Sequence, residues 1–255
     1  SAMEDRTREL NQEIQERKKV EEKIKESNLV LRKTNAELDN FVYKVSHDLR
    51  APIASILGIA NVAKKETEKA LIDQHLDFVA KSANQLDTFI KDILDLSRNA
   101  RLDVDKEEIQ WQEMVEGIFE QLKYTSAQNN GFVKKVEVTQ EHPFFSDRRR
   151  IQVVLNNLIS NAIRYSNGKK PYVQVNVNTS QKIAKISITD NGIGIPEKHI
   201  PHIFNMFYRA TDKNAGSGLG LYIVKETLDK LEGKIEIESK ENAGTTIKLE
   251  IPDMV

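Results

Sequence analysis

The sequence contains no cysteine among its 255 residues. It therefore cannot form a disulfide or hold a metal ion through thiolates, and this composition fits a reducing compartment such as the cytoplasm. Two of the five histidines, His199 and His202, lie close together, but Pro201 interrupts the helical spacing between them. We therefore expect no metal site built on histidine or cysteine.

Long apolar runs are also missing. No stretch approaches the roughly 20 residues that a membrane-spanning helix needs, and no signal peptide opens the chain. Residues 1–3, Ser-Ala-Met, resemble an expression remnant, so we expect the natural chain to continue upstream. The sequence leaves open whether that upstream part is anchored in a membrane.

An excess of basic residues is missing too. The 38 lysines and arginines are balanced by 39 aspartates and glutamates, which gives a net charge of −1. Proteins that bind nucleic acids usually carry a basic excess or a basic stripe, so we expect no nucleic-acid partner. The one basic cluster, Arg148 to Arg150, is expected on the solvated face of a helix start.

Proline and glycine are absent before Pro52, and residues 4 to about 66 therefore favour one long helix. Apolar side chains recur there at intervals of seven: Ile24, Leu31, Leu38 and Val45. Asn28 and Asn35 make the interleaved row polar, so residues 1–37 predict only a marginal coiled-coil linker. From residue 38 onward the seam becomes consistently apolar.

A second helix is predicted at about 70–98, because apolar residues keep the alternating spacing of three and four through almost four heptads. The two helices and the charged turn between them predict a helical hairpin over residues 38–102. A lone hairpin buries little apolar area, so we expect two copies of the chain to pair into a dimeric four-helix bundle.

The pattern changes at about residue 108 to segments in which apolar and polar residues alternate with period two. These segments predict strands at 135–139, 172–178, 183–189, 234–238 and 245–251. Helical stretches lie between them at 112–127, 147–165 and 219–231. This order predicts an α+β sandwich over residues 103–255, in which helices cover one face of a single sheet.

His47 lies on the long predicted helix and is followed by Asp48 and Arg50. The apolar rows place its ring at the outermost heptad position, away from the core. A neutral imidazole is a nucleophile, and Asp48 can hold a ring N–H and take up the proton. Arg50 can neutralise phosphate charge, and Pro52 should bend the helix just beyond the site. A lone surface histidine is usually inert, so its neighbours carry the prediction of a catalytic site.

Asn157 and Asn161 lie four residues apart, so their amide oxygens share one face of a predicted helix. Neutral oxygens suit Mg²⁺ when phosphate groups supply the negative charge. Arg164 and Tyr165 continue this polar face. Taken alone, the segment is equally consistent with a plain asparagine-rich surface.

Asp190 directly follows a predicted strand, and the segment that it opens contains Gly192, Gly194 and Ile195. An ionised carboxylate only accepts hydrogen bonds, so it would accept from the exocyclic amine of adenine and repel the carbonyl of guanine. The glycines let the backbone approach a base closely. The alternative for this segment is an ordinary Asp-Asn-Gly turn.

A glycine-rich segment opens the last predicted helix and consists of Gly216, Ser217, Gly218, Leu219 and Gly220. Such backbone at a helix N-terminus can hold phosphate through free N–H groups and the helix dipole. Arg209, which follows an aromatic cluster, is a candidate phosphate contact. The chain lacks the P-loop pattern, the protein-kinase His-Arg-Asp signature and the early glycines of a dinucleotide-binding fold.

In their order and spacing these segments resemble the sensor histidine kinase family over residues 38–255. Residues 47–52 are similar to its phosphoacceptor box, and Asn157 with Asn161 to its asparagine box. Residues 190–194 are similar to the first glycine box, 204–207 to the phenylalanine box, 216–220 to the second glycine box, and 244–245 to the last. Each match is weak alone, but the ordered set is specific.

The resemblance implies a dimeric hairpin domain followed by a Bergerat-type ATP-binding sandwich, the fold shared with gyrase, Hsp90 and MutL. The phosphoryl group of ATP would pass to His47 and then to an aspartate on a response-regulator receiver domain. This chain lacks that receiver, and the upstream sensor domain would also lie outside it.

The resemblance also implies roles within the nucleotide site. Asn157 and Asn161 would hold Mg²⁺, and Asp190 would read adenine. The remaining contacts would be Tyr165 on the base, Thr245 near the adenine, and Arg164 and Arg209 on phosphates. Residues 208–217 would form a mobile lid over the nucleotide.

One position departs from the family. Many members carry Thr or Asn four residues after the histidine, where it is thought to orient water for dephosphorylating the partner, whereas this chain has Ala51. Phosphatase activity is therefore in doubt. Two other functions stay open at this stage. One is a gyrase- or Hsp90-type ATPase without phosphohistidine, and the other is a coiled-coil scaffold with an inert nucleotide domain.

Overall fold

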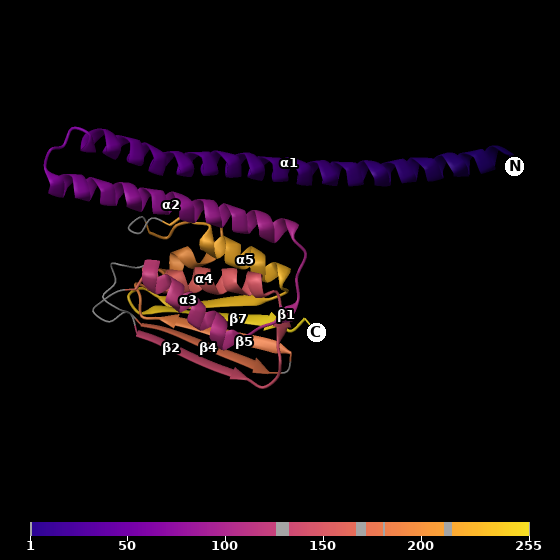
Figure 1. The fold of residues 1–255 in the computed structure, drawn as a ribbon. Coiled ribbons are helices and arrows are strands. Elements are labelled where there is room, and N and C mark those ends of the chain that lie inside the picture. The colour runs from indigo at the N-terminus through magenta and orange to yellow at the C-terminus, as the bar shows by residue number, and fades with distance from the viewer. Residues whose placement is uncertain (1, 126–132, 167–171, 181, 212–215, 255) are drawn as a thin grey trace. The chain divides into compact units, whose positions relative to one another are not determined.

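The computed structural model describes residues 2–125, 133–166, 172–180, 182–211 and 216–254. The chain divides into two compact units, residues 1–79 and 80–255, and each is described by itself. The first unit is helical, whereas the second contains the end of one helix and a sheet covered by further helices (Figure 1). The predicted fold classes, a helical hairpin and an α+β sandwich, are both confirmed.

The helical part begins with α1 (Ala2–Ala63), which is continuous through Pro52. A short turn follows, in which the carboxylate of Glu66 accepts hydrogen bonds from the backbone N–H groups of Thr67 and Glu68. These two bonds favour the ionised carboxylate and lower the pKa of Glu66. The second helix, α2 (Lys69–Arg101), then leads from the first unit into the second.

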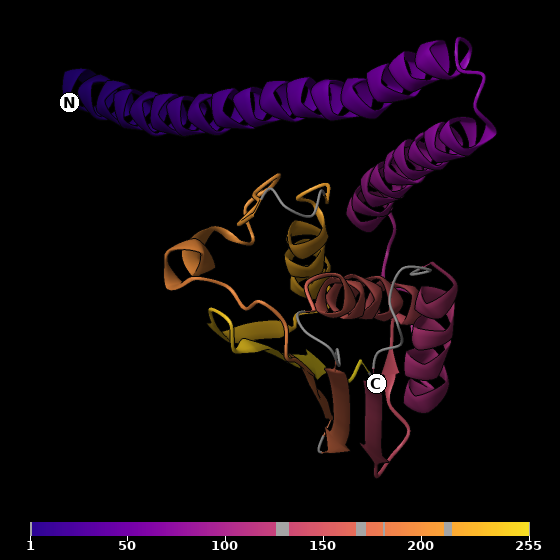
Figure 2. The ribbon, with the colours of Figure 1, turned by 90° about the vertical axis from the view of Figure 1, so that its left-hand side faces the viewer.

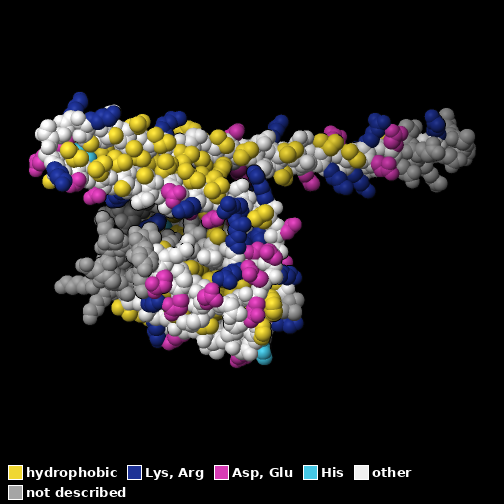
Figure 3. Space-filling model, viewed as in Figure 1, with side chains coloured by type: hydrophobic (Ala, Val, Ile, Leu, Met, Phe, Trp, Pro, Cys, Tyr) yellow, Lys and Arg dark blue, Asp and Glu magenta, His cyan; other side chains and the backbone are white. Residues whose placement is uncertain are grey.

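Large apolar side chains remain exposed along the first unit, as the yellow atoms over the helices in Figure 3 illustrate. They include Leu38, Val42, Leu57, Val62, Leu76 and Phe78. An exposed apolar surface of this extent is typical of an interface that one chain cannot bury by itself.

The second unit is built on a five-stranded sheet with the order β2-β4-β5-β7-β6. Its strands are β2 (Val133–Gln140), β4 (Tyr172–Ser180), β5 (Ile183–Asp190), β6 (Lys234–Lys240) and β7 (Gly244–Pro252). The pair β2–β4 is parallel, and the other neighbours are antiparallel. Two short strands, β1 (Glu107–Glu108) and β3 (Phe145–Ser146), pair separately and were not predicted from the sequence.

Three helices, α3 (Trp111–Thr125), α4 (Arg148–Arg164) and α5 (Gly220–Lys230), cover one face of this sheet (Figure 2). The strands present alternate residues to them, and Val173, Val175 and Ile186 are almost completely buried. This alternation is the period-two pattern expected for strands with one buried face. A short 3₁₀ helix, η1 (Glu197–His202), follows β5 and was also not predicted.

Arg150 connects the start of α4 to the end of α2. Its guanidinium pairs with Asp147, which caps α4 by accepting a 2.9 Å hydrogen bond from the Arg150 backbone N–H. The same guanidinium donates to the carbonyls of Asn99, Leu102 and Asp103, the last acceptors of α2 and its following turn. The expectation of a solvated face is thus wrong for Arg150, which is only 6% exposed, because these carbonyls and the capping aspartate surround it.

Candidate functional site

His47 lies on the surface of α1 with its side chain about two-thirds exposed. Its Nδ1 atom is 3.0 Å from Oδ1 of Asp48, whose side chain is mostly covered. The tautomer with its proton on Nδ1 satisfies this contact and leaves the Nε2 lone pair open to solvent. Arg50 is also exposed, one turn along the same helix face from Ser46. The arrangement can present a neutral imidazole to a phosphoryl donor.

Asp190 is the last residue of β5, the central strand of the sheet in the second unit. Its Oδ1 atom accepts backbone hydrogen bonds from Gly192 at 2.8 Å and from Thr245 at 3.2 Å. Both bonds use the same oxygen, so Oδ2 remains available to accept from a ligand. Burial raises the pKa of Asp190, although the two backbone bonds oppose the shift.

The segment after Asp190 packs closely against its neighbours. Gly194 has φ +65°, and a Cβ atom there would lie 2.0 Å from the carbonyl oxygen of Lys240. No other residue fits such a position without moving the backbone. The backbone N–H of Ile193 donates to the carbonyl of Tyr165 at 3.0 Å, which joins the segment to the end of α4. The first glycine segment therefore contacts the last turn of α4 as well as the β6–β7 turn.

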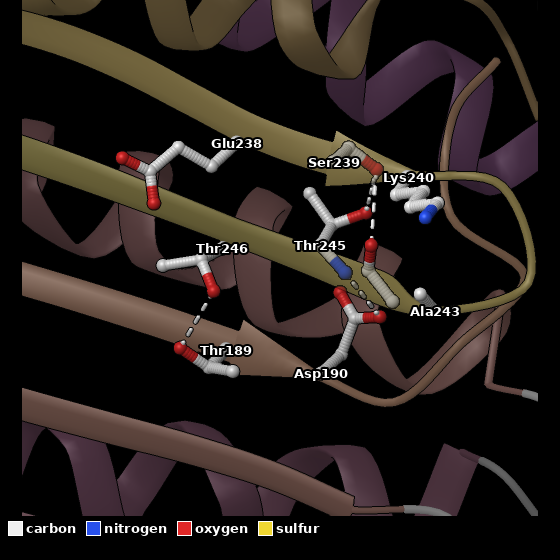
Figure 4. A pocket seen from close by; sticks show the side chains of 9 residues that line it. Thr189, Asp190, Glu238, Ser239, Lys240, Ala243, Thr245 and Thr246 are labelled. Carbon is white, nitrogen blue, oxygen red and sulfur yellow. Dashed lines mark hydrogen bonds between the residues drawn. The ribbon is translucent and has the colours of Figure 1, made fainter.

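Ser239 hydrogen-bonds to the segment after Asp190 and to the start of β7, and it was not among the site residues predicted from the sequence. Its hydroxyl accepts from the backbone N–H of Ile195 at 2.8 Å. It also lies 2.8 Å from the hydroxyl of Thr245 (Figure 4). It also donates to the carbonyl of Gly244 at 3.1 Å. No sequence signal distinguishes Ser239 from other polar strand residues, because its partners come from two separate segments.

A cavity of about 370 Å³ opens at these strand ends. Its lining includes Asp190, Ser239, Gly244 and Thr245, together with Thr189, Glu238, Lys240, Ala243 and Thr246 (Figure 4). Thr189 and Thr246 hydrogen-bond to each other across β5 and β7 at 3.1 Å. The cavity thus borders the carboxylate and the final glycine segment that the sequence analysis assigned to the base.

The asparagine face of α4 meets the start of α5. Asn157 donates through Nδ2 to the carbonyl of Val153 at 2.9 Å, which leaves its Oδ1 atom for another partner. A Cβ atom on Gly220 would lie 2.8 Å from this Oδ1 and 3.9 Å from Nδ2 of Asn161. Both asparagines are therefore adjacent to the glycine-rich loop.

The other end of α4 meets the beginning of the same loop. A Cβ atom on Gly216 would lie 2.8 Å from Nη1 of Arg164 and 4.0 Å from the hydroxyl of Tyr165. The side chains of Arg164 and Tyr165 therefore border the loop that the sequence analysis assigned to phosphate.

The loop itself turns sharply before α5. Gly218 has φ +72° and approaches the backbone of Phe207 so closely that a Cβ atom would lie 2.8 Å from the Phe207 carbonyl carbon. Ser217 accepts from the backbone N–H of the buried Leu219 at 3.1 Å. The N-cap residue of α5, Leu219, supplies no side-chain hydrogen bond to the first turn. A helix N-terminus without a side-chain cap is a position that favours an anionic ligand.

The predicted lid, residues 208–217, is described only at its two ends, because residues 212–215 lie outside the described residues. Tyr208 accepts or donates a 2.7 Å hydrogen bond with Nδ1 of His199 on η1. Arg209 is exposed, and its role as a phosphate contact stays a prediction.

The donor set fits a magnesium ion that is bound together with phosphate. The amide oxygen of Asn157 is available beside the glycine-rich loop, and Asn161 lies next to it. Over the described part of the chain, no group of three or more His, Asp or Glu residues could hold a metal ion without additional ligands. Two neutral amides would hold Mg²⁺ only if phosphate oxygens completed the coordination.

Two family models match the chain. The His Kinase A (phospho-acceptor) domain matches residues 37–101, and the model described as histidine kinase-, DNA gyrase B-, and HSP90-like ATPase matches residues 146–254. The second model alone would also include gyrase- and Hsp90-type ATPases. The phospho-acceptor match separates this chain from them.

The chain belongs to the sensor histidine kinase family. It is 33% identical over 226 residues to the methanogenesis regulatory histidine kinase FilI of Methanothrix harundinacea, a match that covers 86% of this chain and 25% of FilI. The sensor histidine kinase WalK of Bacillus subtilis is 31% identical over 229 residues, which cover 86% of this chain and 37% of WalK. The chain thus spans about a quarter to a third of the curated relatives that it matches.

Solved structures show the same fold. The histidine kinase ThkA in its complex with the response regulator protein TrrA matches with a TM-score of 0.68 and 24% identity, covering 88% of this chain and 64% of ThkA.

None of the helices in the described part of our chain combines the length and the apolar character that crossing a bilayer takes.

Proposed function

We propose that this chain binds ATP with Mg²⁺ and transfers the γ-phosphoryl group to Nε2 of its own His47. The observation that carries the proposal is the exposed ring of His47, which lies 3.0 Å from Asp48. The close packing of the end of α4 against both Gly192 and the glycine-rich loop supports a nucleotide site in the second unit. Family membership supports the same reaction.

The proposed site residues fall into three groups. Asp190 accepts from the adenine amine, with Gly192, Gly194, Ile195, Tyr165 and Thr245 around the base. Gly216, Ser217, Gly218, Leu219 and Gly220 surround the phosphates, with Arg164 and Arg209 as cationic contacts. Asn157 and Asn161 hold Mg²⁺, which would neutralise phosphate charge and polarise the transferred group.

In the proposed reaction at His47, the Nε2 lone pair attacks the γ-phosphorus, the bond from this phosphorus to the bridging oxygen breaks, and ADP leaves with the electron pair of that bond. The ring is then cationic, because Nδ1 still carries its proton, and Asp48 accepts this proton as the charge develops. Arg50 adds positive charge near the transferred group.

We further propose that two copies of the chain form a homodimer through the exposed apolar face of the first unit. The phosphoryl group would then pass from His47 to an aspartate of a response-regulator receiver domain. Light scattering on residues 31–255 tests the pairing, because a monomer at micromolar concentration would contradict it.

Ala51 is exposed one turn after His47 and offers only a methyl group beside the phosphoacceptor. A methyl group cannot orient water, so we propose a kinase and phosphoryl donor with little phosphatase activity. The test adds the unlabelled chain with ADP to a phosphorylated receiver. Phosphate release much faster than the receiver's own decay would contradict the proposal.

Incubation with γ-labelled ATP tests the proposed function against its alternatives. Acid-labile, base-stable label on the protein supports a histidine kinase. Steady release of free phosphate without label supports an ATPase, and neither label nor release supports an inert scaffold.

A further inference from the structure

Asp92 contacts the glycine-rich loop from the part of α2 that belongs to the second unit. Its Oδ2 atom accepts a 2.5 Å hydrogen bond from the hydroxyl of Ser217, 125 residues further along the chain. The same hydroxyl oxygen accepts from the backbone N–H of Leu219 at the start of α5. A carboxylate is thus linked through one serine to the loop that, in the proposed function, surrounds the phosphates of ATP.

The α2 segment that carries Asp92 is anchored on both sides of it. Phe89, one turn earlier, is only 6% exposed and is the buried residue of α2. At the far end of the segment, the Arg150 guanidinium binds the carbonyls of Asn99 and Leu102. The Arg150 contacts join the end of α2 to the start of α4, so Asp92 lies on a helix segment that is tied to the second unit.

The surroundings of Asp92 resemble those that a phosphate group requires. The carboxylate lies near the positive end of α5 and accepts from a serine hydroxyl. Two other charged groups face it: Arg164 of α4, which is attractive, and Asp95 of α2, which is repulsive. Burial raises the pKa of Asp92, and the Ser217 hydrogen bond and Arg164 oppose this shift. The carboxylate of Asp92 thus interacts with Ser217 and Arg164, two of the groups that we assign to the phosphates.

We propose that Asp92 is an internal competitor of ATP, whose carboxylate holds the nucleotide-free glycine-rich loop through Ser217 and is displaced when the phosphates bind. The inference rests on the proposed role of residues 216–220 in phosphate binding. A negative charge beside the loop repels the phosphates of ATP, so Asp92 lowers nucleotide affinity until its contact opens. Nucleotide binding is thereby coupled to opening of the contact between Asp92 and Ser217.

Calorimetry on the full chain with Mg²⁺ tests the proposal, with ATP and adenosine as the two probes. Asp92→Asn keeps the shape and can still accept from Ser217, but it removes the charge. Asp87→Asn is the matched control, because Asp87 lies on the same helix, is exposed, and pairs only locally with Lys91. We expect Asp92→Asn to raise ATP affinity by roughly three- to tenfold, and to leave adenosine affinity unchanged. Added salt should reduce the gain.

Three results for Asp92→Asn, and one for the unsubstituted chain, would overturn the proposal. ATP affinity equal to that of the unsubstituted chain would show that Asp92 does not compete, while leaving the proposed ATP binding intact. An equal gain for adenosine would mean that the substitution alters the fold and not phosphate repulsion. Loss of ATP affinity would mean that Asp92 supports the loop. If the unsubstituted chain failed to bind ATP at all, the proposed function would fall with the inference.

Discussion

The Nδ1 atom of His47 lies 3.0 Å from Oδ1 of Asp48 on the same turn of α1. This contact fixes the ring orientation and leaves Nε2 exposed. In the proposed reaction, it would also give the proton of Nδ1 an acceptor when phosphorylation makes the ring cationic.

Asp48→Asn keeps the size of the side chain but removes the proton acceptor. We expect the initial rate of label incorporation from γ-labelled ATP to fall by about 10² or more, since general-base groups typically contribute 10²–10⁴. ATP affinity should stay unchanged, because the substitution lies in the first unit. Asp39→Asn, an exposed change on the same helix, is the control. A full rate in Asp48→Asn would exclude Asp48 as the base.

Asp190→Asn should weaken ATP binding. Oδ1 would still accept from Gly192 and Thr245, but the amide nitrogen would replace Oδ2 and face the adenine amine as a second donor. A mismatched buried polar pair costs about 1–3 kcal/mol, which is roughly 5- to 150-fold in the dissociation constant. Calorimetry measures the change, and Asp229→Asn on the surface of α5 serves as the control. Unchanged affinity would place the base elsewhere.

Although Asp190→Asn should weaken ATP binding, it should stabilise the fold relative to the unsubstituted chain as pH rises. Burial raises the pKa of Asp190 above its ordinary value of 3.8, so the folded chain binds more protons than the unfolded chain at and above that pH. The stability that comes from the protonated carboxyl is therefore lost as pH rises through the raised pKa. Asp190→Asn does not titrate, so its free energy of unfolding relative to the unsubstituted chain should increase between pH 4 and pH 7. Urea titrations at several pH values measure this difference, and a difference that falls with pH would contradict the assigned direction.

Arg150→Ala should be strongly destabilising. It would leave the buried carboxylate of Asp147 without its charged partner, and the carbonyls at the end of α2 without a donor. Breaking one side of a buried pair costs about 3–5 kcal/mol. Arg149→Ala removes the same charge from the neighbouring exposed position and should change the free energy of unfolding by no more than about 0.5 kcal/mol. Equal effects in the two variants would contradict the role of Arg150.

The regular elements could be predicted because their periodicity is local. The strand predicted at 183–189 is observed at Ile183–Asp190, and the helix predicted at 147–165 at Arg148–Arg164. Strands β1 and β3 have two residues each, which is too short for any alternation to appear. The long helix predicted to reach about residue 66 is observed as α1, which continues through Pro52 to Ala63.

The candidate site segments could be named from the sequence, whereas the contacts between them could not. The asparagines, Asp190 and the glycines were chosen by residue type and spacing, and their roles stay predictions. The partners of Arg150, Ser239 and Asp92 lie on distant segments, so a local pattern carries no information about them. Arg150 illustrates the difficulty, since a run of three arginines favours solvent unless a buried aspartate and free carbonyls are known to surround one of them.

The central claim is that His47 receives the phosphoryl group of ATP. The most direct measurement compares the unsubstituted chain with His47→Gln after incubation with γ-labelled ATP and Mg²⁺, and titrates ATP binding in the same preparations. We expect acid-labile, base-stable label on the unsubstituted chain, no label on His47→Gln, and equal ATP affinity for both. Such label persisting in His47→Gln would contradict the account, because another residue would then be the phosphoacceptor.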